Sequence, residues 1–593
     1  MTIHHRVEAL RLWMKAHGLQ AFIIPSTDPH SGEYVPAHWM TRQWISGFDG
    51  SAGTAVVTLT DAALWTDSRY FLAAAQQLDG TPFCLMKDGL SETPSIAEWL
   101  SAKLQQGDAV GVDSTVNTVA DFDALSQELL LSGIEVKAAA DPADELWTDR
   151  PAIPQDKVEI QPLELAGETA QSKIERVRQF LGEKGADGLI ISQLDEVAWL
   201  LNLRGSDVHC NPVFVAYVLL TMDSVTLCID PVKTEGAVDD YLREAGIATC
   251  PYGQVFGLLK QHAGERIAFD PNTTNQAIKS SLGEAKDGQT ISSPIAPMKA
   301  VKNEAEIAGF RQAMLRDGVA MVRFLRWLKP AVEAGGETEM SVDRKLTALR
   351  AEQKLFRGLS FDTIAGYGPH GAIVHYEATP ATDVKLNPEG LLLLDSGAQY
   401  QDGTTDITRT IALGPVNEEE KLDYTLVLKG HIRLALTRFP DGISGTQIDA
   451  MARYAMWQHG INYGHGTGHG VGSYLNVHEG PHQIRHSWKP APLRAGMTVT
   501  NEPGIYRAGK HGVRTENTML IIEDGQTEFG RFLRLDPLTL CPIDLTPVLW
   551  DMMLPDETAY LNAYHQRVYE ALSPYLDEDE RLWLRQQTAP VEG

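Results

Sequence analysis

The chain has 593 residues, of which 43% are hydrophobic and 22% are charged. One hydrophobic core rarely serves more than about 300 residues, so this length predicts three to four domains. The formal net charge of −27 argues against nucleic acid or an anionic membrane as a general partner. The five cysteines are scattered without a CxxC pair, which argues against a thiolate zinc site and fits a reducing compartment.

The N-terminal segment, MTIHHRVEALRLWMKAHG, has no continuous apolar stretch, so it is not predicted to be a signal peptide. No run of about 18 apolar residues occurs in the sequence, and therefore no transmembrane helix is expected. The sequence predicts a cytoplasmic protein that has neither nucleic acid nor a membrane as a partner.

A sequence pattern is repeated in the first half of the chain. RVEALRLWMKAHGLQAFIIPSTD (6–28) matches KIERVRQFLGEKGADGLIISQLD (173–195), so that Val7 aligns with Ile174 and Gly18 with Gly185. Each copy has the spacing of a helix that stops at a glycine and is followed by a buried strand. Two copies are too few for a solenoid, so we predict two duplicated α/β domains.

Two proline-containing segments, DRPAIPQDK and SSPIAPMKAVKNE, are predicted to be connectors. We therefore expect domains at residues 1–156, 157–299 and 300–593. After the second connector, apolar residues recur at helical spacing from Ile307 to Leu328, which predicts an amphipathic helix at the start of the third domain.

Four carboxylates and one imidazole in the third domain are candidate metal ligands: Asp395, Asp406, His469, Glu502 and Glu516. Oxygen-rich sets of this kind suit Mn²⁺ and similar divalent ions better than a thiolate zinc site does. Four carboxylates also carry the charge that offsets two divalent ions, an arrangement that hydrolytic enzymes use to activate water.

The two aspartates lie in neighbouring predicted strands. Asp395 ends the apolar run LLLLD, and Asp406 stands in the alternating segment TTDITRTIAL. A short loop flanked by glycines would join the two as a hairpin, so that both carboxylates could enter one site. A solvated surface turn explains either aspartate alone equally well.

Histidines and glycines alternate in GHGTGHGVG, which lacks the Lys-Ser/Thr of a phosphate-binding loop. The glycines would let the backbone pass close to a site into which His465 and His469 point. His478 follows closely, and three histidines among glycines favour a site over packed or solvated residues. In GVRTENTMLII, read as one strand, Arg514 and Glu516 would share a face, unless they form a plain surface ion pair.

Taken together, DSGAQY, TTDITRT, HGTGHGVG, NEPG and RTEN resemble the metal-dependent pita-bread peptidases, the family of methionine aminopeptidase, prolidase, creatinase and aminopeptidase P. GAIVHY, LKGHI and PLTLCPIDL make the long, three-domain Xaa-Pro aminopeptidase type the more similar one. The resemblance implies a chain of α/β and α+β class, in which two duplicated creatinase-like α/β domains are followed by a C-terminal pita-bread catalytic domain with a curved, mostly antiparallel sheet.

The resemblance also implies a ligand set for two divalent metal ions, with Mn²⁺ expected. Asp395 would hold one ion, and His469 and Glu502 mainly the other. Asp406 and Glu516 would bridge both, and a water activated by the two ions would be the nucleophile.

Further residues match active-site positions of the family. Glu502 would take up the proton of the water. His478 and His375 would assist substrate binding and proton transfer, and His465 would line a proline pocket. Arg514 also matches an active-site position.

The implied reaction is hydrolysis of the N-terminal Xaa-Pro bond of peptides. This tertiary amide lacks the N–H that ordinary peptidases bind, so a site shaped for the ring must recover that binding energy. A prolidase-like dipeptidase and a non-catalytic peptide or protein binder are the alternatives. The resemblance suggests a homodimer, in which the segment YLNAYHQRVYEALSPYL either takes part or packs on its own domain.

Overall fold

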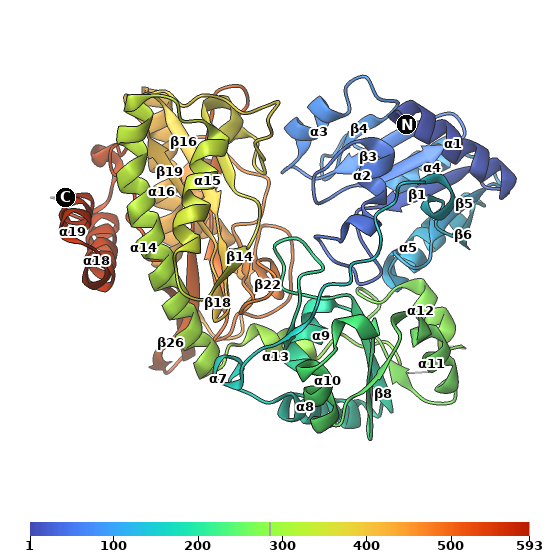
Figure 1. The fold of residues 1–593 in the computed structure, drawn as a ribbon. Coiled ribbons are helices and arrows are strands. Elements are labelled where there is room, and N and C mark those ends of the chain that lie inside the picture. Colours follow the sequence, from blue (N-terminus) through green and yellow to red (C-terminus); the bar gives the residue numbers. More distant parts are fainter. Residues whose placement is uncertain (284–285, 287, 592–593) are drawn as a thin grey trace. The chain divides into compact units, whose positions relative to one another are not determined.

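The computed structural model describes residues 1–283, 286 and 288–591, and the chain divides into two compact units. The first unit comprises residues 1–161 and 168–295, and the second comprises residues 162–167 and 296–593 (Figure 1). None of the helices among the described residues combines the length and the apolar character that a membrane crossing would need.

Two sheets with the same strand order form the core of the first unit. The first sheet has the order β4(Cys84–Lys87)-β3(Ala62–Thr66)-β2(Thr54–Thr58)-β1(Ala21–Pro25)-β5(Ala109–Asp113)-β6(Glu135–Ala139). The second sheet has the order β12(Ala248–Cys250)-β11(Val225–Ile229)-β10(Ala216–Thr221)-β8(Gly188–Ile191)-β13(Ile267–Ala268). In both, the third and fourth strands are antiparallel and the fourth and fifth are parallel, so the predicted duplication is confirmed at the level of topology.

The repeated sequence forms equivalent helices in the two copies. Helix α1 (Ile3–Ala16) buries Val7 and Leu10, and helix α8 (Ala170–Lys184) buries Ile174 and Val177 at the matching positions. The remaining helices of the unit are α2 (Thr41–Ser46), α3 (Phe71–Gln77), α4 (Ile96–Lys103), α5 (Val119–Leu130), α6 (Ala143–Leu146), α9 (Leu194–Leu201), α10 (Ala237–Glu244), α11 (Val255–Gln261) and α12 (Gln276–Ser281). Strands β7 (Glu159–Ile160) and β9 (Leu203–Arg204) pair with each other.

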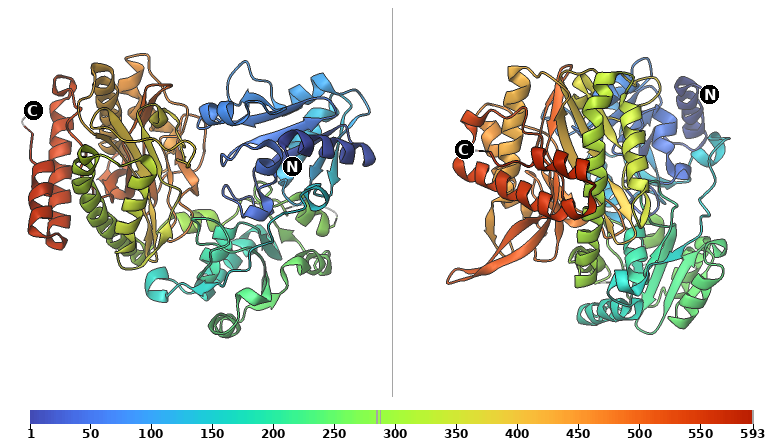
Figure 2. Two further views of the ribbon diagram at one scale, coloured as in Figure 1. Left: turned by 45° about the horizontal axis from the view of Figure 1, so that its top comes forward. Right: turned by 60° about the vertical axis from the view of Figure 1, so that its left-hand side comes forward.

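Long helices frame the second unit. The predicted amphipathic helix is α14 (Glu304–Ala334), which begins at a capping box made by Asn303 and Glu306. The connector before it contains a short helix, α13 (Ile295–Ala300). The other helices are α7 (Leu163–Ala166), α15 (Glu339–Ala351), α16 (Glu418–Ala435), α17 (Asp449–Trp457), α18 (Pro555–Leu572) and α19 (Glu578–Gln587). Helices α18 and α19 contact α14 (Figure 2).

The named strands of this unit pair antiparallel in five small groups. These are β14(Phe356–Leu359)-β17(Ala398–Tyr400)-β18(Gly403–Thr404), β15(Ile364–Tyr367)-β16(Leu391–Ser396)-β19(Ile407–Ala412), β20(Arg438–Pro440)-β27(Gly530–Pro537)-β26(Asn517–Thr527)-β23(Thr498–Asn501), β21(Gly468–Gly470)-β22(Glu479–Ile484) and β24(Gly504–Arg507)-β25(His511–Arg514). Leu434 of α16 and Ala452 of α17 pack in one apolar cluster with Val499 and Met519, so these helices cover strands β23 and β26.

The reading of residues 512–522 as one continuous strand is wrong. Strand β25 ends at Arg514 and pairs with β24, whereas β26 begins at Asn517 and pairs with β23. Between them, the amide of Glu516 donates to the carbonyl of Thr408 in β19 at 3.1 Å. The chain therefore bends at Glu516 because its backbone changes partners there.

The C-terminal segment packs on its own unit. Leu561, Tyr564 and Val568 of α18 lie in an apolar cluster with Leu428 and Ile432 of α16. The apolar stripe of this helix is thus used within the chain.

Candidate metal centre

Strands β16 and β19 bring the two candidate aspartates together. They pair antiparallel with Asp395 opposite Thr408, and Asp406 directly precedes β19, as the predicted hairpin requires. Both aspartates are buried. An apolar strand pair therefore delivers two carboxylates into the interior, where each needs a partner.

His469, on β21, faces two of the carboxylates. Its Nε2 lies 3.4 Å from Asp406 Oδ2 and 3.4 Å from Glu502 Oε1. Its Nδ1 lies 2.9 Å from the carbonyl oxygen of Gly470. A carbonyl can only accept, so Nδ1 carries a proton and Nε2 is the ring nitrogen that faces the carboxylates, as in a metal-ligating histidine.

The two glutamates lie at strand ends. Glu502 follows β23, and Glu516 stands in the bend between β25 and β26. Thr408 Oγ1 donates to Glu516 Oε2 at 2.7 Å, and Thr500 Oγ1 donates to Glu502 Oε1 at 3.3 Å. One ligand atom each of Asp406, His469 and Glu516 falls within 4.8 Å of the others.

The carboxylates repel one another strongly in this buried setting. Burial, with the charges of Asp395 and Glu502, raises the pKa of Asp406 well above its ordinary value. Burial, with the charges of Asp406, Glu502 and Asp395, likewise raises the pKa of Glu516. Burial also raises the pKa of Glu502 to about 7; Asp395 adds to this rise and Arg514 opposes it. Such a cluster is stable in its ionised form only when positive charge is supplied.

A donor set of this composition fits two divalent cations. Asp395 Oδ1 is buried and has no hydrogen-bond partner among the described residues, while Oδ2 accepts from Arg514 at 2.7 Å. Four carboxylates and one imidazole match the ligand chemistry of Mn²⁺-type ions.

The other candidates surround this cluster. The ring of His478 lies 4.4 Å from that of His469, edge to face. Arg514, besides holding Asp395, donates to the carbonyl of Val374, the neighbour of His375, at 3.4 Å. His375 itself is half-buried.

His465 is linked to Arg514 through Tyr506, which the sequence reasoning missed. Arg514 Nη1 donates to the Tyr506 hydroxyl at 2.7 Å, and that hydroxyl lies 2.7 Å from His465 Nε2. His465 Nδ1 lies 2.7 Å from the carbonyl of Gly466, so the hydroxyl donates to Nε2. The signal was available, since Tyr506 stands two residues after the glycine of NEPG on the short strand β24.

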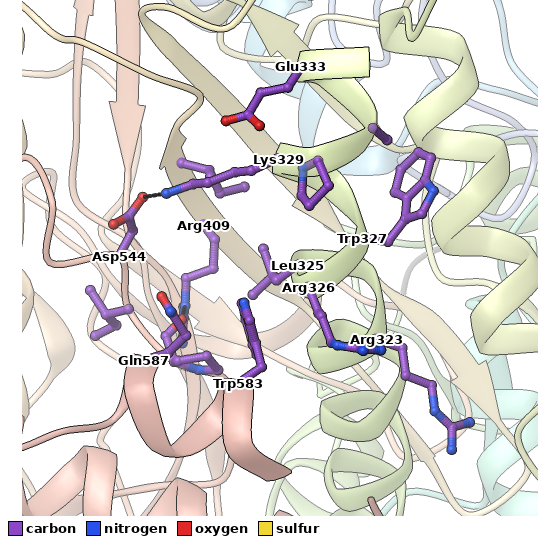
Figure 3. A pocket seen from close by; sticks show the side chains of 15 residues that line it. Arg323, Leu325, Arg326, Trp327, Lys329, Glu333, Arg409, Asp544, Trp583 and Gln587 are labelled. Atoms are coloured by element: carbon purple, nitrogen blue, oxygen red, sulfur yellow. Dashed lines mark hydrogen bonds and ion pairs between the residues drawn. The ribbon is translucent and has the colours of Figure 1, made fainter. Parts of the chain in front are cut away.

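A cavity of about 780 Å³ lies between α14, β19 and α19, and its lining includes none of the nine candidates (Figure 3). Two of the basic groups on its wall are paired already, with Lys329 Nζ 3.3 Å from Asp544 and Arg323 Nε 3.0 Å from Glu580. The carboxylate cluster, and not this cavity, has the chemistry of a metal centre.

Known protein families match nearly the whole chain. Metallopeptidase family M24 matches residues 308–523, and the C-terminal region of peptidase M24 matches 531–591. Creatinase/prolidase N-terminal domains match residues 6–146 and 149–306.

Individual relatives cover the chain to different extents. A protein named Probable Xaa-Pro aminopeptidase P from Laccaria bicolor is 42% identical over 99% of this chain and 93% of its own length. The crystal structure of X-prolyl aminopeptidase from Caenorhabditis elegans, described as a cytosolic enzyme with a di-nuclear active site, covers 100% of both chains at 35% identity with a TM-score of 0.95. Xaa-Pro dipeptidase from Bacillus anthracis covers only 64% of this chain, at 26% identity with a TM-score of 0.51.

Proposed function

This chain belongs to metallopeptidase family M24, and we propose that it removes the N-terminal residue from peptides whose second residue is proline. The observation that carries the proposal is the convergence of Asp406, His469 and Glu516, one ligand atom of each lying within 4.8 Å of the others. The full-length match to an X-prolyl aminopeptidase supports the same substrate class.

We propose Asp395, Asp406, His469, Glu502 and Glu516 as the ligands of two divalent ions, with Mn²⁺ as the preferred metal. When bound, the ions would supply Lewis-acid activation of water and of the scissile carbonyl. Thr408 and Thr500 support the proposal, because they hold one oxygen each of Glu516 and Glu502 in a fixed direction.

Glu502 is the proposed proton acceptor. In the metal-free protein, burial raises the pKa of Glu502 to about 7 and the charges of Arg514 and His478 oppose that rise, whereas bound divalent ions would lower the pKa further. Thr500 occupies Oε1, so Oε2 is the oxygen proposed to take the proton. His478 and His375 would then bind the substrate and return a proton to the departing proline nitrogen.

The linked pair His465 and Tyr506 is proposed to line the proline pocket. Arg514 fixes the hydroxyl of Tyr506, and that hydroxyl fixes the His465 ring, so the pocket wall is held before substrate arrives. A preorganised wall recovers binding energy from the proline ring without a backbone N–H.

The leading domains distinguish the aminopeptidase from the alternatives. We propose the division 1–156, 157–299 and 300–593, a homodimer, and a cytoplasmic location. The creatinase/prolidase matches and the description of the Caenorhabditis elegans enzyme as cytosolic support the division and the location. A dipeptidase remains the rival activity, because the Bacillus anthracis enzyme shares the fold over part of the chain.

A peptide panel tests the proposal. The purified chain with added Mn²⁺ should cleave Xaa-Pro-Xaa tripeptides, leave Xaa-Ala-Xaa tripeptides largely intact and turn over Xaa-Pro dipeptides more slowly. Faster turnover of the dipeptides would establish a prolidase, and intact tripeptides throughout would leave a peptide binder.

A single substitution tests the metal centre itself. Asp406→Asn removes one negative charge from a buried site without changing its shape, so Mn²⁺ binding and turnover should fall by a factor of about 100 or more. Asp402→Asn, at a buried aspartate in the same hairpin that pairs with Arg316, is the matched control and should keep metal binding. Normal turnover of the Asp406 variant would refute the proposed site.

A further inference from the structure

Buried asparagines flank both proposed ligand glutamates. Asn501 precedes Glu502, Asn517 follows Glu516, and the two asparagines are direct partners in the pairing of β23 with β26. Both asparagines are fully buried. The register between β23 and β26 therefore sets the distance between the backbones of Glu502 and Glu516.

His431, from the LKGHI segment of α16, lies between the two asparagines. Its Nδ1 is 3.1 Å from the carbonyl of Asn501, and its Nε2 is 3.4 Å from the side-chain nitrogen of Asn517. The side chain of Asn501 donates to the carbonyl of His431 at 2.8 Å. A neutral ring with its proton on Nδ1 satisfies these contacts, and burial, with the charge of Arg409, lowers the pKa of His431 to about 3.

Arg409 holds the same strand pair from β19. Its Nη1 donates to the carbonyl of Glu516 at 2.7 Å and to that of Thr408 at 3.0 Å, and its Nη2 donates to Asn517 Oδ1 at 2.9 Å. Nε donates to the carbonyl of Pro542, and Nη2 also lies within hydrogen-bond distance of the carbonyl of Cys541 and the hydroxyl of Tyr564, so its two N–H groups are shared among three acceptors. The planar guanidinium is thus saturated by the protein and is not available to a ligand, although its side chain borders the cavity of Figure 3.

We propose that His431 and Arg409 are positioning residues that set the separation and direction of Glu502 and Glu516, and thereby the affinity for divalent ions. The inference rests on the proposed function, which makes these glutamates metal ligands. The backbone contacts of His431 and Arg409 end on Asn501, on Glu516 itself and on Thr408, whose hydroxyl binds Glu516. Outer contacts of this kind change metal affinity by about 10–100-fold in other proteins.

Apolar packing alone does not account for this arrangement. A buried imidazole, two amides and a guanidinium cost stability wherever a polar atom lacks a partner, as Asn501 Oδ1 does among the described residues, and side chains of similar volume without polar atoms would stabilise a fold as well. The geometry couples α16, β19 and the C-terminal region to the two strand ends that carry the glutamates.

The test measures binding of Mn²⁺ alone to the full-length protein, by chelator competition, together with thermal unfolding. His431→Leu should weaken Mn²⁺ binding about 10–100-fold in protein that is still folded. His431→Asn keeps a donor where Nδ1 stood and should recover most of the affinity. Arg409→Lys, which cannot reproduce the planar set of donors, should weaken binding as His431→Leu does.

A matched control separates positioning from stability. His565 is also a buried neutral histidine, and its Nε2 accepts from the amide of Ile543 at 3.1 Å. His565→Leu should lower the melting temperature and leave Mn²⁺ affinity unchanged. Wild-type Mn²⁺ affinity in both His431→Leu and Arg409→Lys would overturn the inference. If His431→Leu does not fold, wild-type Mn²⁺ affinity in Arg409→Lys would be enough to overturn it. A wild-type chain that binds no Mn²⁺ would instead overturn the proposed function.

Discussion

At the scale of single residues, hydrogen bonds decide what each side chain of the centre can do. The carbonyl of Gly470 fixes the tautomer of His469, and the carbonyl of Gly466 fixes that of His465. One ring then turns its Nε2 to the carboxylates, while the other accepts from Tyr506. The two histidines of one glycine-rich segment thus make different interactions, because their neighbours differ.

The raised pKa of Glu502 predicts how the metal-free protein responds to pH. Burial moves this pKa from 4.5 to about 7, so the folded state binds the proton more tightly than the unfolded state does. The raised pKa of Glu502 therefore adds on the order of 3 kcal/mol to the free energy of unfolding. This contribution is complete below about pH 4.5 and is lost as pH rises through about 7. Urea unfolding in the presence of a chelator should therefore show a less stable protein at pH 8 than at pH 5.

The variant Glu502→Gln provides the control for this prediction. Glutamine does not titrate, so the difference in the free energy of unfolding between pH 5 and pH 8 should shrink. Equal pH dependence in the wild type and the variant would contradict the assignment of that loss to Glu502.

At the scale of elements, close backbone contacts bring the segments of the centre together. A Cβ atom on Gly468 would lie 1.9 Å from the carbonyl oxygen of Thr500, so β21 can approach β23 only with glycine there. This approach places His469 beside Glu502. Among the glycines predicted to let the backbone pass close to a site, Gly468 stands where the fold leaves no room for a side chain.

Gly468→Ala should therefore displace β21 from β23. We expect a loss of about 1–3 kcal/mol in the free energy of unfolding and weaker Mn²⁺ binding, because overpacking shifts the backbone that carries His469. Gly466→Ala is the control in the same segment, since its Cβ would meet its nearest atom at 3.4 Å. Denaturant unfolding and metal titration should separate the two, and equal effects would argue against a close contact at Gly468.

At the scale of the whole molecule, the chemistry is confined to one of two compact units. All nine candidate residues lie in the second unit, between His375 and Glu516. The first unit holds the duplicated sheets and none of the proposed ligands.

Metal binding should consequently stabilise the two units unequally. A ligand stabilises the cooperative unit that binds it, so saturating Mn²⁺ should raise the melting temperature of the second unit and leave that of the first unchanged. Differential scanning calorimetry with and without Mn²⁺ measures this, and Asp406→Asn should abolish the shift. A single transition that moves as a whole would mean that the two units unfold together.

The sequence by itself determined the duplication, the class of fold, the long helix α14 and the nine candidate residues. The duplication was predicted from a pattern that recurs along the chain, and the class of fold from motifs that resemble a known family. The helix and the candidate residues depend on local signals: helical spacing, an apolar run that ends in a carboxylate, or glycines beside histidines. Such signals lie in residues that are close together in the sequence, so they do not depend on which segment packs against them in the fold.

Only the tertiary structure decided the break at Glu516, the roles open to Tyr506 and the placement of His431 and Arg409. The strand predicted for residues 512–522 is interrupted because the amide of Glu516 donates to the carbonyl of Thr408, a residue far away in the sequence. Periodicity within one segment carries no information about a hydrogen bond to another. The metal centre is of this kind, since its ligands meet only when five short segments are folded against one another.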